Sequence, residues 1–312
     1  MVKKNLIKRI LQILMVLMGI SFLTFCLTYL APGDPVRTMY AASGVIPSED
    51  VLDQAREELG LNKPFLVQYG TWLFNCFHGD FGTSYSMNKP VLEIMITKLF
   101  PTLKLAFVSL LLMIAVSVPF GILAAVKKNK FVDYLVRSTT FLGISVPNFW
   151  VGLLLLYFFG LKLGLLPVVS TGNGWEKLIL PAVTLSFAMS AKYTRQVRTA
   201  VLEELHQDYV MGARARGIAE KTILWRHVFP NTLLPLVTLL GLSLGSLLGG
   251  TAVVEVVFSY PGLGNMAVCA ITAYDYPLIQ GYVLWIALIY MAINLIVDIS
   301  YEFIDPGVRE SR

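Results

Sequence analysis

Long apolar runs separated by polar segments dominate this chain. Five runs contain no charged residue: 10–31, 105–126, 138–161, 228–254 and 277–297. Each is long enough to cross a hydrocarbon core of about 30 Å as a helix that rises about 1.5 Å per residue. A sixth run, 178–191, is shorter, and we expect its helix to continue through Lys192 and Arg195, whose long side chains reach the interface. The pattern predicts an all-α polytopic membrane protein with six transmembrane helices.

The first run follows four basic residues within the first nine positions. A cleaved signal peptide is the alternative interpretation. The run is longer than a usual signal core, and Tyr29-Leu30-Ala31-Pro32 is a poor cleavage site. We therefore expect a retained first helix.

The distribution of Lys and Arg predicts the orientation of the six helices. The N-terminus, the 127–137 and 192–227 segments and the C-terminal tail together hold 17 of the 25 basic residues. Because basic residues concentrate in cytoplasmic segments, these segments and both termini are expected to be cytoplasmic. The cell membrane is the expected location.

The opposite side then carries a large excursion between the first two helices. Residues 48–61 show a capping serine followed by amphipathic spacing, and 64–73 continue with a second apolar face. We expect two helices here. The predicted division is residues 1–101, the first span with its external excursion, and residues 102–312, a five-span membrane domain that contains a cytoplasmic loop at 197–230.

That loop contains the most unusual polar segment of the chain, 208–231. We expect a short helix at 209–216, ended by Gly217 in the left-handed conformation, and a second helix that starts near Ala219 and ends before Pro230. Gly212 and Ala213 are expected to leave one side of the first helix bare, so that a partner can approach closely. An ordinary basic cytoplasmic loop is the alternative.

Two of the apolar runs carry polar positions. In 138–161, Pro147 is expected to kink the helix, and a plain packing kink is the favoured interpretation, with Asn148 as a candidate contact on a translocation path. In 228–254, glycine recurs every four residues, which favours close helix packing. Ser243, Ser246 and Thr251 on this run are further candidates for the path.

Composition narrows the possible functions. The chain is 56% hydrophobic and 14% charged, which is typical of membrane proteins. Its net charge is +5, but its basic residues form no continuous stripe that would bind nucleic acid.

The sequence lacks a G-x-x-x-x-G-K-[ST] phosphate loop, H-E-x-x-H and G-x-S-x-G, so we expect a transport subunit rather than an enzyme. We predict no catalytic or metal site, because Cys76 and His78 lack a clear third ligand. A transporter driven by an ion gradient is an alternative, but the five clear runs lack the charges that such carriers use.

Gly217, nine further residues and then His227-Val228-Phe229-Pro230 resemble the EAA loop of ABC importer permeases. The usual Glu-Ala-Ala stands here as Met211-Gly212-Ala213, so the glutamate is missing. The segment 213–217 instead resembles the dipeptide, oligopeptide and nickel permeases, which commonly lack it. Further similarity to that family lies in the order of short motifs at 61–64, 79–84, 147–150, 255–264 and 274–281.

The resemblance implies a MetI-like ABC importer permease architecture. It implies a second homologous permease, which forms a heterodimer with this chain, two ABC ATPase subunits and an extracytoplasmic solute-binding protein as partners. ATP and Mg²⁺ would be used by the ATPase, and no cofactor by this chain. The residues expected to couple to the ATPase are Tyr209, Gly212, Ala213, Arg214, Arg216, Gly217, Trp225 and Pro230.

The expected substrate follows from the similarity of short segments to particular members of this family. Segments 67–73, 147–150 and 277–280 resemble nickel permeases, so nickel or a metal chelate is the expected cargo, with dipeptides or oligopeptides as the alternative.

Overall fold

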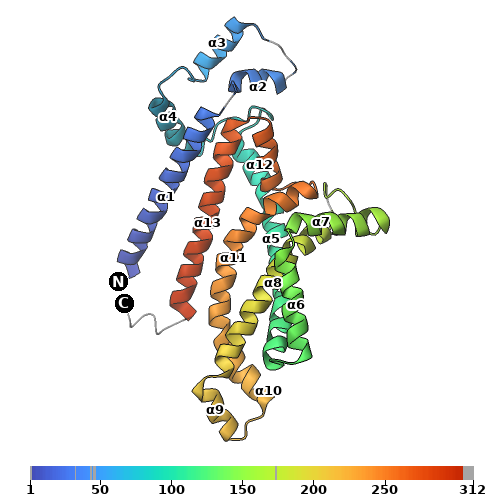
Figure 1. Ribbon diagram of the computed structural model, residues 1–312. Coiled ribbons are helices and arrows are strands. Elements are labelled where there is room, and N and C mark those ends of the chain that lie inside the picture. Colours follow the sequence, from blue (N-terminus) through green and yellow to red (C-terminus); the bar gives the residue numbers. More distant parts are fainter. Residues whose placement is uncertain (1, 32, 43, 45–46, 173, 305–312) are drawn as a thin grey trace. The chain divides into compact units, whose positions relative to one another are not determined.

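The computed structural model describes residues 2–304 except 32, 43, 45–46 and 173, and these residues are almost entirely helical (Figure 1). Within them the only strand-like pairing is an isolated bridge between Thr83 and Pro90. The chain forms two compact units. The N-terminal unit comprises the segment up to Thr102 together with Pro261–Ala292, and the central unit comprises Leu103–Tyr260 and the segment from Ile293 onward.

The N-terminal unit contains two long helices and several short ones. The long helices are α1 (Val2–Leu30) and the first part of α13 (Tyr276–Ile304). The others are α2 (Pro35–Ala42), α3 (Glu49–Glu58), α4 (Phe65–Phe77), the start of α5 (Val91–Val126) and α12 (Leu263–Thr272). The two helices expected in the excursion are confirmed as α3 and α4, but the side chain of Ser48 makes no capping hydrogen bond at the start of α3. α2 has no counterpart in the sequence interpretation.

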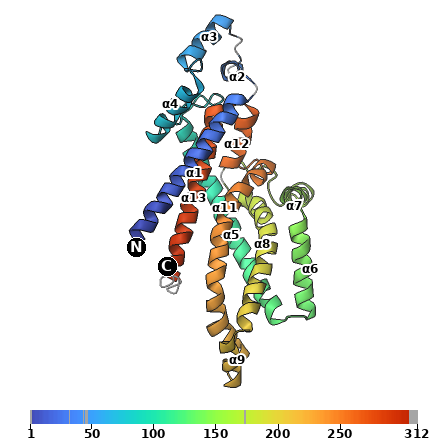
Figure 2. The ribbon, with the colours of Figure 1, turned by 60° about the vertical axis from the view of Figure 1, so that its left-hand side comes forward.

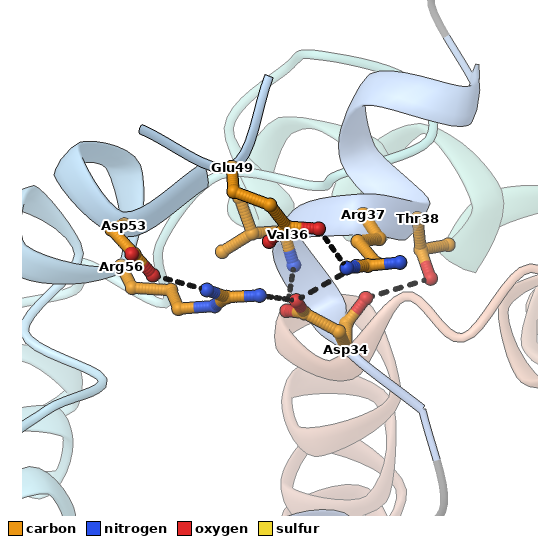
Figure 3. Close-up of polar contacts among 7 residues, drawn as sticks. All are labelled: Asp34, Val36, Arg37, Thr38, Glu49, Asp53 and Arg56. Atoms are coloured by element: carbon orange, nitrogen blue, oxygen red, sulfur yellow. Dashed lines mark hydrogen bonds and ion pairs between the residues drawn. The ribbon is translucent and has the colours of Figure 1, made fainter. Parts of the chain in front are cut away.

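An ion-pair network holds α2 and α3 together (Figure 3). Arg56 of α3 pairs with Asp34, and Arg37 of α2 pairs with Glu49. Asp34 also accepts a hydrogen bond from the amide of Val36 at 3.0 Å. Burial alone would raise the pKa of Asp34, but the hydrogen bonds from Arg56 and Val36 outweigh it, so this pKa lies below its ordinary value.

A second polar contact joins distant parts of the N-terminal unit. Asp275 is fully buried, and its Oδ2 accepts hydrogen bonds from the hydroxyl of Ser84 at 2.6 Å and from the hydroxyl of Ser86 at 2.7 Å. The amide of Ser86 donates to the same oxygen at 2.9 Å. Asp275 thus fixes the end of the excursion to the turn that begins α13.

The central unit is a group of helices packed around α8 (Glu176–Leu205). α6 (Phe131–Ser145) and α11 (Phe229–Val257) both lie beside α8 (Figure 2). Gly143 of α6 lets the two backbones approach closely, because an added Cβ there would lie 2.8 Å from the Cβ of Ala191. Two apolar clusters fill the unit, one around Phe258 and Leu185 and one around Val197 and Ile223.

The third apolar run is not one kinked helix. α6 ends at Ser145, and α7 (Asn148–Leu155), continued by a π-helical segment Leu156–Lys162, leaves it at an angle of 98° (Figure 1). Val146 between them is extended, with φ −93° and ψ 129°. The residue before proline is disfavoured in the helical conformation, so Pro147 breaks the helix through Val146 instead of merely bending it.

By length and composition, three helices could cross a membrane among the described residues, at Arg9–Leu30, Val91–Val126 and Tyr276–Ile296. The bent pair Phe131–Ser145 and Asn148–Lys162 makes a fourth if it counts as one span. Helices also cover the expected fourth and fifth spans, as α8 and α11. The six-span arrangement itself stays a prediction.

Candidate docking surface

The polar segment between α8 and α11 forms a compact helical turn at one end of these two helices (Figure 1). α9 spans Asp208–Ala215, and Gly217 follows with a φ of +76°. The amide of Ile218 donates to the carbonyl of Ala213 at 3.2 Å, and the amide of Gly217 donates to that of Arg214 at 2.9 Å. These two hydrogen bonds form a Schellman ending, which places its left-handed residue directly after the helix. The expected short helix and its glycine turn are confirmed.

The second helix of the segment differs from the expectation. α10 covers Glu220–Ile223, a π-helical turn covers Leu224–Val228, and α11 begins at once with Phe229. The prediction that the helix ends before Pro230 is therefore wrong. Pro230 lies in the first turn of α11, where its missing N–H costs little, and the π-helical turn shifts the backbone register just before it.

The inner face of the turn packs into the core of the central unit. Val210 and Ala213 of α9 join a buried cluster with residues of α5, α8, α10, the π-helical turn and α11, namely Ile122, Ala125, Val197, Val201, Ile223, Val228 and Leu236. Ala213 is only 3% exposed, so the expectation that it shares a bare face with Gly212 is wrong. Neighbouring residues on a helix point about 100° apart, and this rotation carries Ala213 inward.

The outer face of the turn presents two large apolar side chains, Met211 and Trp225, of which 55% and 50% are exposed. Gly212, which follows Met211 on α9, is also open, because a Cβ added there would meet no atom within 4 Å. Trp225 is held edge-to-face against Phe229 at a ring distance of 5.3 Å. An exposed aromatic side chain in a fixed orientation suits insertion into the groove of a partner protein.

The guanidinium groups of the turn are oriented by local acceptors. Arg214 donates from Nε and Nη2 to the carboxylate of Glu220 at 2.6 and 3.2 Å. Hydrogen bonding to Arg214 lowers the pKa of Glu220, and the same contact raises the pKa of Arg214. Arg216 donates from Nε to the carbonyl of Gly212 at 3.3 Å. Both arginines remain exposed, so they keep donors for acidic groups on a partner.

Tyr209 fastens the turn to its neighbouring helices. Its hydroxyl donates to Oε2 of Glu204 on α8 at 2.6 Å and accepts from Nδ2 of Asn231 on α11 at 3.2 Å. Partial burial and the hydrogen bond to Glu204 raise the pKa of Tyr209. Sequence reasoning singled out Tyr209 but not these two partners, which become visible only once α8 and α11 lie side by side.

A buried ion pair close to the turn was also missed. Asp133 near the start of α6 is fully buried and accepts hydrogen bonds from Nε and Nη2 of Arg198 on α8 at 2.6 and 2.8 Å. The amide of Asn129 donates to the same carboxylate at 2.9 Å. The pair therefore ties the connection between α5 and α6 to α8, the helix that leads into α9.

The candidate path residues are distributed over α7 and α11. Asn148 is half-buried at the start of α7, while Ser243 and Thr251 of α11 are buried inside the central unit. The side chain of Ser246 lies outside the described residues. Of the glycines on α11, Gly241 and Gly245 are buried and Gly249 is exposed. A translocation role for these positions stays a prediction.

Among the described residues, no group of three or more His, Cys, Asp or Glu side chains could hold a metal ion. Cys76 lies on α4, where burial raises the pKa of its thiol to about 12.

Comparison with known proteins decides the family. Residues 117–310 match the family model described as the binding-protein-dependent transport system inner membrane component, and residues 1–106 match the model of its N-terminal region. This chain belongs to that family. It is an ABC importer permease of the peptide and nickel group, as the sequence resemblance implied.

Two relatives share 37% identity with this permease over nearly its whole length. One is a "Probable D,D-dipeptide transport system permease protein" of Escherichia coli, where the match covers 95% of this chain and 94% of the relative. The other is a glutathione transport system permease protein of Salmonella typhimurium, with 97% and 98% covered.

A solved structure shares the fold of this permease. The methionine ABC transporter in an inward-facing conformation matches with a TM-score of 0.61 and 19% identity, over 70% of this chain and 100% of that chain. The MetI-like permease fold and the membrane location expected from the sequence are thereby confirmed.

Proposed function

We propose that this permease imports short peptides, as one half of a translocation path that is energised by partner ATPases. The observation that carries the proposal is the 37% identity to permeases named for D,D-dipeptide and glutathione transport, along almost the entire chain. These relatives favour the peptide alternative over nickel, so peptides replace the metal as the proposed cargo. Glutathione and dipeptides both carry a free ammonium group and a free carboxylate group on a short chain that contains amide bonds.

The partners of the proposed machine follow from the family. A solute-binding protein would deliver peptide on the outer side, and a second homologous permease would form the other half of the path. Two ATPase subunits would bind ATP and Mg²⁺, which this chain is not expected to bind. In this arrangement the termini and the α9 turn face the cytoplasm.

The outer face of the α9 turn is the proposed contact with the ATPase. Met211 and Trp225 offer apolar area, Gly212 offers open backbone, and Arg214 and Arg216 offer donors around them. Tyr209 and the inner-face residues would keep the turn rigid relative to α8 and α11. Movement of the ATPase would then be transmitted to two long helices of the central unit.

The proposal is tested by uptake in a deletion strain that carries the complete transporter. We expect a labelled dipeptide or glutathione to accumulate and labelled nickel not to. Uptake of nickel with no uptake of either peptide would contradict the proposed substrate class. A separate assay tests the assignment of ATP hydrolysis to the partner subunits. The chain purified without its partners is expected to hydrolyse no ATP, because its sequence contains no G-x-x-x-x-G-K-[ST] phosphate loop.

A further inference from the structure

α6 is attached to the rest of the central unit by one narrow stripe of side chains. Many of its apolar side chains are exposed, among them Phe131 and Phe141 at 78% and 66%. Its buried residues follow one another at helical spacing on a single face, namely Asp133, Val136, Thr140 and Gly143. Because so few residues fix the helix, each of these contacts has a large effect on where α6 lies.

The stripe meets α8 in two places. Toward the end of α6, Gly143 brings its backbone close to Ala191 of α8. Near the start of α6, Asp133 accepts hydrogen bonds from Nε and Nη2 of Arg198 at 2.6 and 2.8 Å. A contact of arginine with both carboxylate oxygens fixes orientation as well as distance. Since Asp133 is fully buried, separating the pair would leave an uncompensated charge inside the protein.

The same carboxylate also holds the connection that enters α6. α5 ends at Val126 and α6 begins at Phe131, so the two helices are joined by a short turn. Asn129 in this turn has a φ of +61°, a conformation that asparagine adopts more readily than most residues, and its amide donates to Asp133 at 2.9 Å. Asp133 thus joins the α5–α6 connection and the start of α6 to α8.

The pair lies at the end of α8 that leads into the α9 turn (Figure 2). Arg198 lies about two helical turns before Leu205, where α8 ends. Val197 and Val201, on either side of Arg198 in the chain, belong to the apolar cluster that also contains residues of α9. No described residue of α6 belongs to this cluster. Apolar packing therefore carries a displacement of α9 into α8 and α11, and the ion pair carries it into the start of α6.

The position of α6 in turn sets that of α7. Only Val146 and Pro147 separate the two helices, and α7 leaves α6 at 98° to pack on α8 and α11. Gly152 of α7 lies close to α8, because a Cβ added there would be 3.1 Å from Cγ2 of Thr184. A rotation of α6 about its contact at Gly143 would consequently change how α7 packs on the two long helices.

We propose that Asp133 and Arg198 are a positioning pair that makes α6, and with it α7, follow α8 when the partner ATPase displaces the α9 turn. This inference rests on the proposed contact between that turn and the ATPase. Without the pair, the turn still moves α8 and α11, but α6 does not follow. ATP hydrolysis then continues while the path opens incompletely. The role of the pair is independent of which peptide is transported.

The test removes both charges at once, so that no unpaired buried charge remains. In Asp133→Asn/Arg198→Met the new amide oxygen can still accept from Asn129, whereas the contact with α8 is lost. The complete transporter is reconstituted in proteoliposomes, where uptake of labelled dipeptide and ATP hydrolysis are measured together. We expect the ATPase to stay bound and to hydrolyse ATP at close to the wild-type rate. Uptake per ATP should fall about tenfold, a typical strength of coupling between two sites.

Leu105→Ala is the matched control for a general loss of stability. Leu105 is fully buried on α5, toward the end of that helix away from the pair. Its truncation leaves a cavity and should lower the thermal unfolding temperature at least as much as the double variant does. Uptake per ATP should nevertheless equal that of the wild type. An equal loss of uptake per ATP in both variants would show that reduced stability explains the defect, and the positioning role would be wrong.

A second measurement follows α6 directly and needs no cargo. Phe131→Cys on α6 and Glu203→Cys on α8, both at exposed positions, carry spin labels in a transporter without other cysteines. Pulsed electron paramagnetic resonance compares the distance between the labels without nucleotide and with ATP and vanadate. With the pair intact, we expect the same distance in both states. In the double variant we expect the distance to shift or broaden with ATP, and an unchanged distance would show that α6 follows α8 without the pair.

These measurements separate the role of the pair from the proposed function. If the wild-type transporter takes up neither dipeptide nor glutathione, the proposed cargo is wrong. If Gly217→Val keeps normal uptake with the ATPase bound, the proposed docking surface is wrong. In both cases the label distances still decide whether the pair holds α6 to α8. Wild-type uptake per ATP in the double variant would overturn the positioning role while leaving the proposed function intact.

Discussion

Gly217 shows how one backbone angle fixes the geometry of the α9 turn. Its φ of +76° lies in the left-handed region, yet a Cβ added there would meet no atom within 4 Å. The position therefore requires glycine for its conformation and not for lack of room. Any residue that avoids this angle must redirect α10 relative to α9.

We predict that Gly217→Val abolishes peptide uptake while the protein still reaches the membrane. Valine disfavours the left-handed conformation by about 1 to 2 kcal/mol, so the Schellman ending should open and the outer face of the turn should lose its shape. The measurements are uptake, the amount of protein in the membrane and co-purification of the ATPase.

Gly164→Val is the matched control, because Gly164 has a φ of +62°, equally open surroundings and a position outside the turn. It should keep substantial uptake. Gly212→Glu should also abolish uptake, because it places bulk and negative charge on the outer face without straining φ. Gly212→Ala is its control and should be tolerated. Normal uptake by both Gly217→Val and Gly212→Glu, with the ATPase still bound, would show that the turn is not the docking surface.

Among the elements of the central unit, α6 and α8 are joined by both packing and charge. Gly143 allows close contact with Ala191, and the pair Asp133–Arg198 lies nearer the α9 turn. Because Asp133 is fully buried, its carboxylate depends on Arg198 and on the amide of Asn129 for compensation. α8 can thus carry a displacement of α9 into α6 as well as into α11.

At this scale we predict that Arg198→Met destabilises the protein by about 3 to 5 kcal/mol, because it leaves a buried carboxylate without its cation. Asp133→Asn should also destabilise it. The double variant Asp133→Asn/Arg198→Met should cost less than the sum of the two single changes, since no unpaired buried charge remains. Unfolding in detergent measures all three, and strictly additive losses would rule out the coupling.

At the scale of the whole molecule, the proposed docking role of the α9 turn depends on how the chain is oriented in the membrane. A cytoplasmic α9 turn can reach an ATPase, whereas an external one cannot. The described helices include three or four spans by length and composition, and helices cover the two remaining expected positions. The distribution of basic residues predicts that both termini and the turn lie in the cytoplasm.

We predict that a reporter active only in the cytoplasm is active when fused after Lys128, Gln207 or Arg309. The same reporter should be inactive when fused after Asn62 or Thr272, which belong to the side whose segments together hold only eight of the 25 basic residues. Membrane fractions should contain comparable amounts of each fusion, which controls for expression. An active fusion at Asn62 would contradict the six-span arrangement.

The sequence by itself determined the features that depend on neighbouring residues. Long uncharged apolar runs predicted helices α1, α5, α11 and α13, and a shorter run extended through Lys192 predicted α8. Gly217 predicted the end of α9, because a helix and its cap are set by residues a few positions apart. The order of short motifs likewise indicated the family. The effect of proline was harder to predict from the sequence. Pro147 breaks the helix, because Val146 before it is extended, whereas Pro230 lies in the first turn of α11 and the helix continues past it.

Only the tertiary structure decided which distant residues meet. Asp133 and Arg198 are 65 positions apart, and Asp275 and Ser84 are 191 apart, so no local pattern pairs them. Folding likewise turned Ala213 inward and buried the indole N–H of Trp72 and the hydroxyl of Tyr276 without a hydrogen-bond partner among the described residues. Local chemistry determines where helices begin and end, whereas their packing selects the polar groups that become buried and the partners that they then require.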